Sequence, residues 1–147
     1  ARMHLHETGL EVDYQLITAE QMAIEQPHQY DVVTCMELLE HVPDPASIIR
    51  AAATLVKPDG CIVLSTLNRN VKSFMLAIVG AEYVMNMLPK GTHEYEKFLK
   101  PSELAQAARQ ALLEVSDISG MSYNILTKQY RLGSDIDVNY LMTCRPQ

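Results

Sequence analysis

Two carboxylates and an imidazole lie close together in the sequence, at Glu37, Glu40 and His41. Side chains spaced i, i+3 and i+4 share one face of an α-helix, so this spacing predicts that all three point the same way. Two ionised carboxylates held side by side repel each other, and a divalent cation relieves that repulsion. Oxygen ligands suit magnesium or manganese, whereas an imidazole favours manganese, iron, cobalt or zinc. We therefore predict a catalytic site for a divalent metal, with magnesium favoured and the identity of the metal left open, to which His93 in the later KGTH segment can add a fourth ligand.

The position of these residues in the chain supports this interpretation. The run from Tyr30 to Cys35 is mainly apolar, which is typical of a parallel strand buried on both faces. Ligands bind beyond the carboxyl ends of the strands in open α/β sheets, and Glu37 follows this strand closely. The alternative is an ordinary solvated helix face, with His93 as a loop histidine and nothing more. The position favours an active-site rim.

Composition and charge argue against several classes of protein. The 147 residues are 48% hydrophobic, which is enough for one substantial core and argues for a single domain or part of one. The net charge of −6 and the pI near 5.3 disfavour a nucleic-acid binder, because such proteins normally carry a basic surface. Three separated cysteines without a C-x-x-C pair indicate neither a disulfide framework nor a thiolate zinc site, so a reducing cytoplasm fits best. We expect neither a signal peptide nor a membrane span.

The order of the expected elements predicts an α/β fold. Helices are expected at 1–7, 19–25, 45–56, 71–88 and 101–110, and strands at 12–18, 30–36, 61–67, 112–122, 125–132 and 138–144. Asp44 is expected to cap the helix that starts at Pro45, and Pro58 and Gly60 to stop it. A strand, a helix and a strand in succession favour a crossover between parallel strands. The short strands at the end of the chain predict an antiparallel edge on this sheet.

Five segments of the sequence are distinctive when they are taken together. They are YDVVTCMELLEHVPDPASIIRAAATLVKPDG, STLNRN, VGAEYV, LPKGTHEYEKFLKPSEL and DVNYL. Many class I methyltransferases share EHVPDP, but NRN, KGTH and DVNY in this order closely resemble the bacterial ubiquinone-biosynthesis O-methyltransferases, which depend on S-adenosylmethionine. The resemblance covers essentially the whole chain. It implies a Rossmann-like class I methyltransferase sheet of seven strands, of which this chain holds the third strand onward.

The resemblance also implies a cofactor site and a reaction. Ala19 and Glu20 match the part of the family fold that flanks the adenine of S-adenosylmethionine, and Met36 matches a cofactor contact. The predicted metal residues match a pattern that is similar to the metal site of small-RNA 2′-O-methyltransferases. The family methylates catechol-type hydroxyls of polyprenylated ubiquinone precursors. The resemblance therefore implies a polyprenylated phenol or quinol as substrate and a ubiquinone-biosynthesis complex as partner.

The chain lacks two features of that family. No G-x-G occurs anywhere in it, and the acidic residue that the family uses to hold the cofactor ribose is also missing. Glycines in that motif admit the cofactor closely, and the acidic residue binds its ribose. We therefore expect residues 1–147 to be the C-terminal part of a single methyltransferase domain, with little or no activity alone.

Residues 71–100 are expected to form a helical insertion. The helix expected at 71–88 is largely apolar and is surrounded by basic residues, namely Arg69, Lys72, Lys90, Lys97 and Lys100. This combination suits contact with anionic membrane lipid and predicts a cytoplasmic protein peripherally associated with the inner membrane. The alternative is a lid helix packed on the core. Two rival functions are a metal-dependent RNA 2′-O-methyltransferase, disfavoured by the acidic charge and the apolar insertion, and a lipid-binding module without enzymatic activity.

Overall fold

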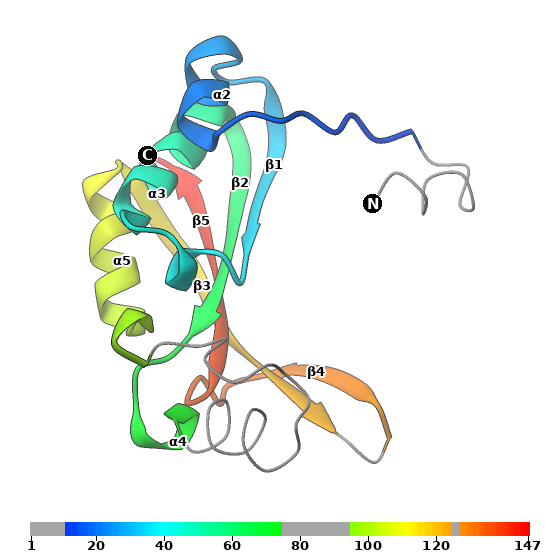
Figure 1. The fold of residues 1–147 in the computed structure, drawn as a ribbon, viewed down its shortest axis with the longest axis vertical. Helices are drawn as coiled ribbons and strands as arrows, with labels where there is room; N and C mark the ends of the chain where they lie inside the picture. The colour runs from blue at the N-terminus through cyan, green and yellow to red at the C-terminus, as the bar shows by residue number, and fades with distance from the viewer. Residues whose placement is uncertain (1–10, 75–94, 125–126) are drawn as a thin grey trace.

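The computed structural model describes residues 11–74, 95–124 and 127–147. They form one five-stranded sheet in the order β1-β2-β5-β3-β4, with helices packed against one face (Figure 1). The strands are β1 (Tyr30–Met36), β2 (Val56–Leu67), β3 (Leu113–Asn124), β4 (Gln129–Gly133) and β5 (Asn139–Pro146). The helical elements are α2 (Ala19–Glu25), the 3₁₀ turn η1 (Leu39–His41), α3 (Pro45–Leu55), α4 (Val71–Ser73), the 3₁₀ turn η3 (Tyr95–Lys97) and α5 (Pro101–Gln110).

The topology confirms the predicted α/β fold. Strands β1 and β2 run parallel, and α3 connects them. Strand β5 runs antiparallel to β2 on one side and antiparallel to β3 on the other. The last strand of the chain therefore inserts between β2 and β3, so the antiparallel edge is confirmed and the order of its strands differs from their order in the sequence.

Helix α3 begins as its local sequence predicts but ends one residue earlier than expected. The side chain of Asp44 accepts a hydrogen bond from the backbone N–H of Ser47 at 3.2 Å, and Pro45 occupies the first turn. Val56, expected in the helix, already belongs to β2. Val56 pairs with Tyr30, and the register then shifts before Cys61 continues the pairing with β1. The Lys-Pro-Asp-Gly segment is thus an irregularity inside the strand.

The hydrophobic core lies between the sheet and helices α3 and α5. Alternate side chains of β2 and β5, including Ile62, Leu64 and Met142, are fully buried against Leu104 and Ala108 of α5 and against α3. Burial of each large aliphatic side chain stabilises the fold by about 1.5–3 kcal/mol. This core holds the carboxyl ends of β1 and β2 in fixed positions.

Burial of Cys144 in this core makes stability depend on pH. Burial raises the pKa of its thiol from the ordinary 9.0 to about 11. The unfolded chain therefore loses the thiol proton at a lower pH than the folded protein does. The contribution of the neutral Cys144 thiol to stability is complete below pH 9.0 and is lost as the pH rises toward about 11. Because of this thiol, we expect the free energy of unfolding to fall by about 2–3 kcal/mol across that interval.

Urea unfolding of the protein and of Cys144→Ala, in reductant, at several pH values from neutral to about 11 tests this prediction. The variant is expected to be less stable at neutral pH, and its stability to fall less steeply with alkali. Burial also raises the pKa of Tyr140, and that effect is common to both proteins. Parallel stability curves for the two proteins would contradict the assignment to Cys144.

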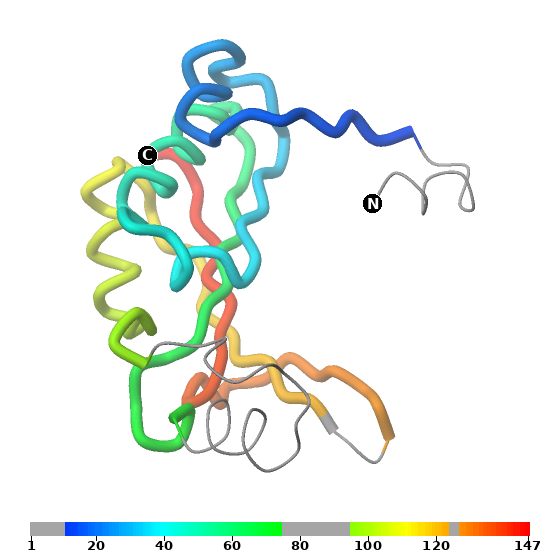
Figure 2. The backbone as a smooth tube through the Cα atoms, viewed as in Figure 1, coloured from blue at the N-terminus to red at the C-terminus, as the bar shows by residue number. Residues whose placement is uncertain are grey.

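The strand expected at 12–18 is not formed. Residues 11–18 are extended but belong to no ladder, and Val12 and Leu16 are exposed. Figure 2 shows this segment running away from the sheet. The alternation of apolar and polar residues was correctly recognised, but a strand also needs the backbone hydrogen bonds of a neighbour. Helix α2 follows this segment as predicted.

The prediction that β1 is buried on both faces is wrong. Only Cys35 of this strand is buried, whereas Val32 is 53% exposed and Met36 is 45% exposed. One face of β1 is exposed because β1 is the end strand of the described sheet and α3 and α5 cover only the other face. The exposed face of β1 thus carries apolar side chains.

The insertion expected at 71–100 is described only at its two ends. Residues Val71–Ser73 are helical, and the segment 75–94, which includes His93 and most of the predicted apolar helix, lies outside the described residues. Within the three described ranges, none of the helices is both long enough and apolar enough to cross a bilayer. The predicted lipid contact of this segment stays a prediction.

Candidate functional site

Glu37 lies at the carboxyl end of β1, where Ser65 of β2 holds both its backbone and its side chain. The backbone N–H of Glu37 donates to the carbonyl of Ser65 at 3.1 Å and to its hydroxyl at 3.0 Å. The same hydroxyl donates to Oε1 of Glu37 at 2.7 Å. Glu37 has a φ of 49°, a left-handed conformation that costs a non-glycine residue of order 1–3 kcal/mol. The hydrogen bonds to Ser65 therefore hold Glu37 in a strained backbone conformation and fix its carboxylate at the end of the strand.

Glu40 occupies a different environment, because it is buried in the core. It is 3% exposed, and the hydroxyl of Thr66 donates to its Oε2 at 2.8 Å. Within the described residues, its Oε1 is buried without a hydrogen-bond partner. Burial and then the Glu40 charge raise the pKa of Cys35. The pKa of Tyr140 is also raised, mainly by burial and then by the negative charges of Glu103 and Glu40.

Within the described residues, Glu37, Glu40 and His41 do not form the predicted metal site. Successive strand residues point to opposite faces of a sheet, so Ser65 and Thr66 hold Glu37 and Glu40 on opposite sides of β2. The helical turn that was expected to align the side chains includes only Leu39–His41, and Glu37 precedes it. No group of three or more His, Cys, Asp or Glu side chains within 11–74, 95–124 and 127–147 is arranged to hold a metal ion. The predicted shared face is therefore wrong, and His93 lies outside the described residues.

The residues predicted to bind the cofactor lie at the start of α2 and the end of β1. Ala19 and Glu20 open α2, whose first turn is capped by the hydroxyl of Thr18. The hydroxyl of Ser47 donates to Glu20 at 2.7 Å, which lowers the pKa of this carboxyl and joins α2 to the first turn of α3. Met36 ends β1 with its side chain nearly half exposed. Their cofactor roles stay predictions.

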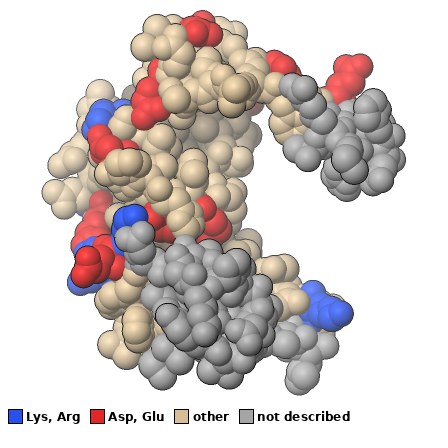
Figure 3. Space-filling model, in the orientation of Figure 1, with Lys and Arg blue, Asp and Glu red and all other residues tan. Residues whose placement is uncertain are grey.

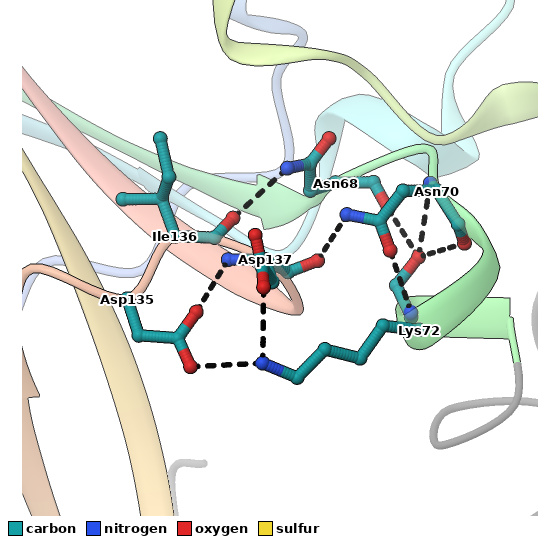
Figure 4. Close-up of polar contacts among 7 residues, drawn as sticks. Asn68, Asn70, Lys72, Asp135, Ile136 and Asp137 are labelled. Atoms are coloured by element: carbon teal, nitrogen blue, oxygen red, sulfur yellow. Dashed lines mark hydrogen bonds and ion pairs between the residues drawn. The ribbon is translucent and has the colours of Figure 1, made fainter.

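A polar network at the exit of β2 was not recognised in the sequence as a structural unit. The side-chain amides of Asn68 and Asn70 donate to the backbone carbonyls of Ile136 at 2.9 Å and Asp137 at 2.5 Å (Figure 4). The backbone N–H of Asn68 donates to the carbonyl of Val138 at 2.8 Å. The segments NRN and DVNY, which were the specific part of the resemblance, therefore bind each other.

Lys72 extends this network from the first turn of α4. Its ammonium group pairs with Asp135 at 2.9 Å and with Asp137 at 3.1 Å (Figure 4). The hydrogen bond to Asp135, followed by that to Asp137, raises the pKa of Lys72. Both carboxylates are largely exposed, so the pairs orient the loop before β5 more than they stabilise it.

The two ends of the 71–100 segment meet beside this network. Arg69 forms an ion pair with Glu103 of α5 and donates to the carbonyl of Glu96 at 3.2 Å. The backbone N–H of Leu99 donates to the carbonyl of Leu67 at 3.1 Å, and the hydroxyl of Tyr140 donates to the carbonyl of Leu99 at 3.0 Å. Polar contacts thus fix the entry and the exit of the insertion at the carboxyl end of β2.

The sequence that forms this arrangement matches a known domain family. The sequence profile of the Methyltransferase domain family matches residues 5–117. The chain belongs to this methyltransferase domain family. Among solved structures, the chain is similar to magnesium protoporphyrin IX methyltransferase from Synechocystis with bound SAH, with a TM-score of 0.64. The match covers 99% of this chain and 57% of that one at 14% identity, so it supports the class I methyltransferase fold alone.

Sequence relatives of this methyltransferase domain are much closer. The chain is 61% identical to a ubiquinone biosynthesis O-methyltransferase of Thiobacillus denitrificans over 145 residues, which are 99% of this chain. It is also 61% identical over 142 residues to the protein of the same name from Stutzerimonas stutzeri. The chain spans 62% of the first relative and 61% of the second.

Proposed function

We propose that this chain is the C-terminal part of an S-adenosylmethionine-dependent O-methyltransferase of ubiquinone biosynthesis. The acceptor is a catechol-type hydroxyl of a polyprenylated phenol or quinol. The observation that carries the proposal is the 61% identity to ubiquinone biosynthesis O-methyltransferase across 99% of the chain. The mutual binding of NRN and DVNY supports it, because these segments meet at the carboxyl end of β2, where α/β folds place their ligands.

The described residues fit one side of an S-adenosylmethionine site. That cofactor supplies an electrophilic methyl group on a sulfonium. Met36 presents an exposed thioether at the end of β1, and Ala19 and Glu20 at the start of α2 would flank the adenine. The chain holds no G-x-G turn for the rest of the cofactor. We therefore propose that residues 1–147 alone have little or no methyltransferase activity.

Glu37 is the residue best placed to handle the acceptor proton. A phenol has a pKa of about 10, so it is a weak nucleophile at neutral pH until its proton is taken or held by a base. One Glu37 oxygen accepts from Ser65, and an ionised carboxylate can accept hydrogen bonds from several donors at once, a substrate hydroxyl among them. S-adenosylmethionine would supply the methyl group and leave as the neutral thioether, and Glu37 would take the proton that the phenolic oxygen loses when it is methylated. Because the described side chains do not form the predicted ligand set, no step of this mechanism uses a metal.

Glu40 and His41 support this arrangement in our proposal. Glu40 anchors η1 to the end of β2 through Thr66, and His41 is the last residue of that turn. The 71–100 segment, held at both ends beside Asn68 and Arg69, contacts anionic lipid, which would bring a cytoplasmic enzyme to the inner membrane. Association with other ubiquinone-biosynthesis proteins follows from the same proposal.

An assay of the completed domain tests the proposal. The chain is joined to the part of the Thiobacillus denitrificans relative that it does not span, and both the chain and the fusion are tested. The fusion is expected to methylate a demethyl-ubiquinone analogue, and the chain alone to show little or no turnover. RNA is the comparison acceptor, and chelator is added in parallel. Methylation of RNA in preference to the quinone analogue, or vesicle binding by a fusion that transfers no methyl group, would contradict the proposed reaction.

A further inference from the structure

Leu38 directly follows Glu37 and carries a large apolar side chain that is 43% exposed. The backbone on both sides of it is held firmly. The backbone N–H of Glu37 donates to Ser65, and the backbone N–H of His41 donates to the carbonyl of Leu38 at 2.9 Å. The next residue, Leu39, is fully buried in the core between the sheet and α3. The backbone of Leu38 is therefore fixed, although much of its side chain lies outside the core.

The place of Leu38 in the fold is that of a ligand contact. Several other exposed apolar side chains lie on segments that leave the body of the sheet (Figure 1), namely Val12, Tyr14 and Leu16 in the segment 11–18 and Tyr123, Tyr130 and Leu132 in the hairpin of β3 and β4. Met36 and Leu38 instead flank Glu37 at the carboxyl end of β1, where ligands of open α/β sheets bind. Figure 3 shows a mainly uncharged surface over β1, with acidic atoms where the strand ends. Apolar contacts around a single carboxylate are typical of a small-molecule site.

The acceptor is the ligand that must come closest to Glu37 in the proposed reaction. A group that takes the proton of a phenolic hydroxyl lies about 2.6–3.2 Å from that oxygen. Consecutive Cα atoms are about 3.8 Å apart, so the side chain that follows Glu37 can reach a ring held at this distance. Met36, on the other side of Glu37, is proposed above to contact the cofactor. Leu38 is thus the neighbour of Glu37 that is available to the acceptor.

We propose that Leu38 is a specificity-determining residue that contacts the aromatic ring of the phenolic acceptor. The inference rests on the proposed function, because it requires Glu37 to take the acceptor proton. An aliphatic side chain packs against the ring and leaves the ring hydroxyls to Glu37, since it has no polar group of its own. Because the backbone at this position is already fixed, little conformational entropy is lost when the ring binds. Leu38 selects the acceptor and takes no part in the proton transfer.

Kinetics of the fusion described above test this assignment. Leu38→Ala is expected to raise the KM for the demethyl-ubiquinone analogue about tenfold, because most of an aliphatic contact is lost. The KM for S-adenosylmethionine and the pH dependence of kcat should stay unchanged, since Met36 and Glu37 are intact. Leu38→Met keeps the volume of the side chain and should restore the KM. The matched control, Leu112→Ala, makes the same change at an exposed site (71%) just before β3 and should alter neither KM.

Equilibrium binding gives a measure that does not depend on turnover. A methoxyphenol product analogue is added to the fusion saturated with S-adenosylhomocysteine, and its binding is followed by calorimetry. Leu38→Ala is expected to bind it about tenfold more weakly than the parent fusion does. Leu38→Gln keeps the length of the side chain and replaces its apolar end, so it should weaken binding too. It is the second variant if Leu38→Ala does not fold.

Different results would overturn the inference in different ways. Equal acceptor binding by Leu38→Ala and the parent would exclude the contact, while methylation by the parent would leave the proposed function intact. A loss of kcat as large as that of Glu37→Gln would show that the variant disturbs Glu37. A lower thermal midpoint with an unchanged acceptor KM would show that the rest of the domain covers Leu38. A parent fusion that does not methylate the analogue would contradict the proposed function itself, and this inference with it.

Discussion

Gly120→Ala is expected to lower the free energy of unfolding by about 3 kcal/mol. A Cβ atom at Gly120 would lie 1.7 Å from the carbonyl oxygen and 2.4 Å from the carbonyl carbon of Asp135. Both are backbone atoms, so no side-chain rotation can relieve the overlap. The loop before β5 must move, and its hydrogen bonds to Asn68 and Asn70 are lost with it. Urea unfolding measures the change, and the midpoint of thermal unfolding should fall by about 6 to 12 °C.

Gly133→Ala is the matched control. Gly133 lies directly opposite Gly120 in the hairpin register, and a Cβ atom there meets nothing within 4 Å. Its replacement should change stability by no more than about 0.5 kcal/mol. Similar losses of unfolding free energy in the two variants would show that position 120 needs glycine for backbone flexibility in the hairpin, and not because Asp135 lies close to it.

Glu37→Gln is expected to lower kcat of the completed enzyme by about 100-fold or more while the protein stays folded. Glutamine keeps the size of the side chain and can still accept from Ser65, but it cannot take a phenolic proton. The effect should appear in kcat with the quinone analogue and leave the KM for the cofactor nearly unchanged. Ser65→Ala should have a smaller effect on kcat, because it loosens Glu37 without removing the carboxylate.

Glu40→Gln separates this mechanism from a metal site that uses both glutamates. Removal of a buried charge with one unpartnered oxygen is expected to raise the free energy of unfolding by about 1 kcal/mol or more. Its effect on kcat should be much smaller than that of Glu37→Gln. Equal losses of kcat in the two variants, together with full inhibition by chelator, would instead support a shared metal site.

Local sequence signals predicted most of the fold. Asp44 and Pro45 begin α3 as expected, and the apolar run of β1 and the strand of β2 were found because their side-chain patterns are local. The strand order was not predicted, because the insertion of β5 between β2 and β3 depends on contacts between residues far apart in the chain. The strand expected at 12–18 failed for the same reason, since pairing needs a neighbour that the pattern does not specify.

The site was predicted only in part. The sequence correctly indicated that Glu37 follows the end of β1, because strand boundaries are local. It failed to predict the orientation of Glu40, because the spacing was interpreted as a regular helical turn. The positive φ of Glu37 and the alternation of Ser65 and Thr66 place the two carboxylates on opposite sides. The hydrogen bonds between NRN and DVNY join segments about seventy residues apart, and no local pattern could have shown them.

The position of β1 has a consequence for the solubility of the protein. In the described sheet β1 pairs only with β2, so one row of its backbone N–H and C=O groups is open to another chain. Such an edge is a template for sheet extension between molecules, and the exposed Val32 and Met36 favour that association. No lysine or proline in β1 blocks it. A polypeptide segment that pairs with this edge of β1 would therefore protect the protein from aggregation. It would lie beside the strand that Glu37 directly follows.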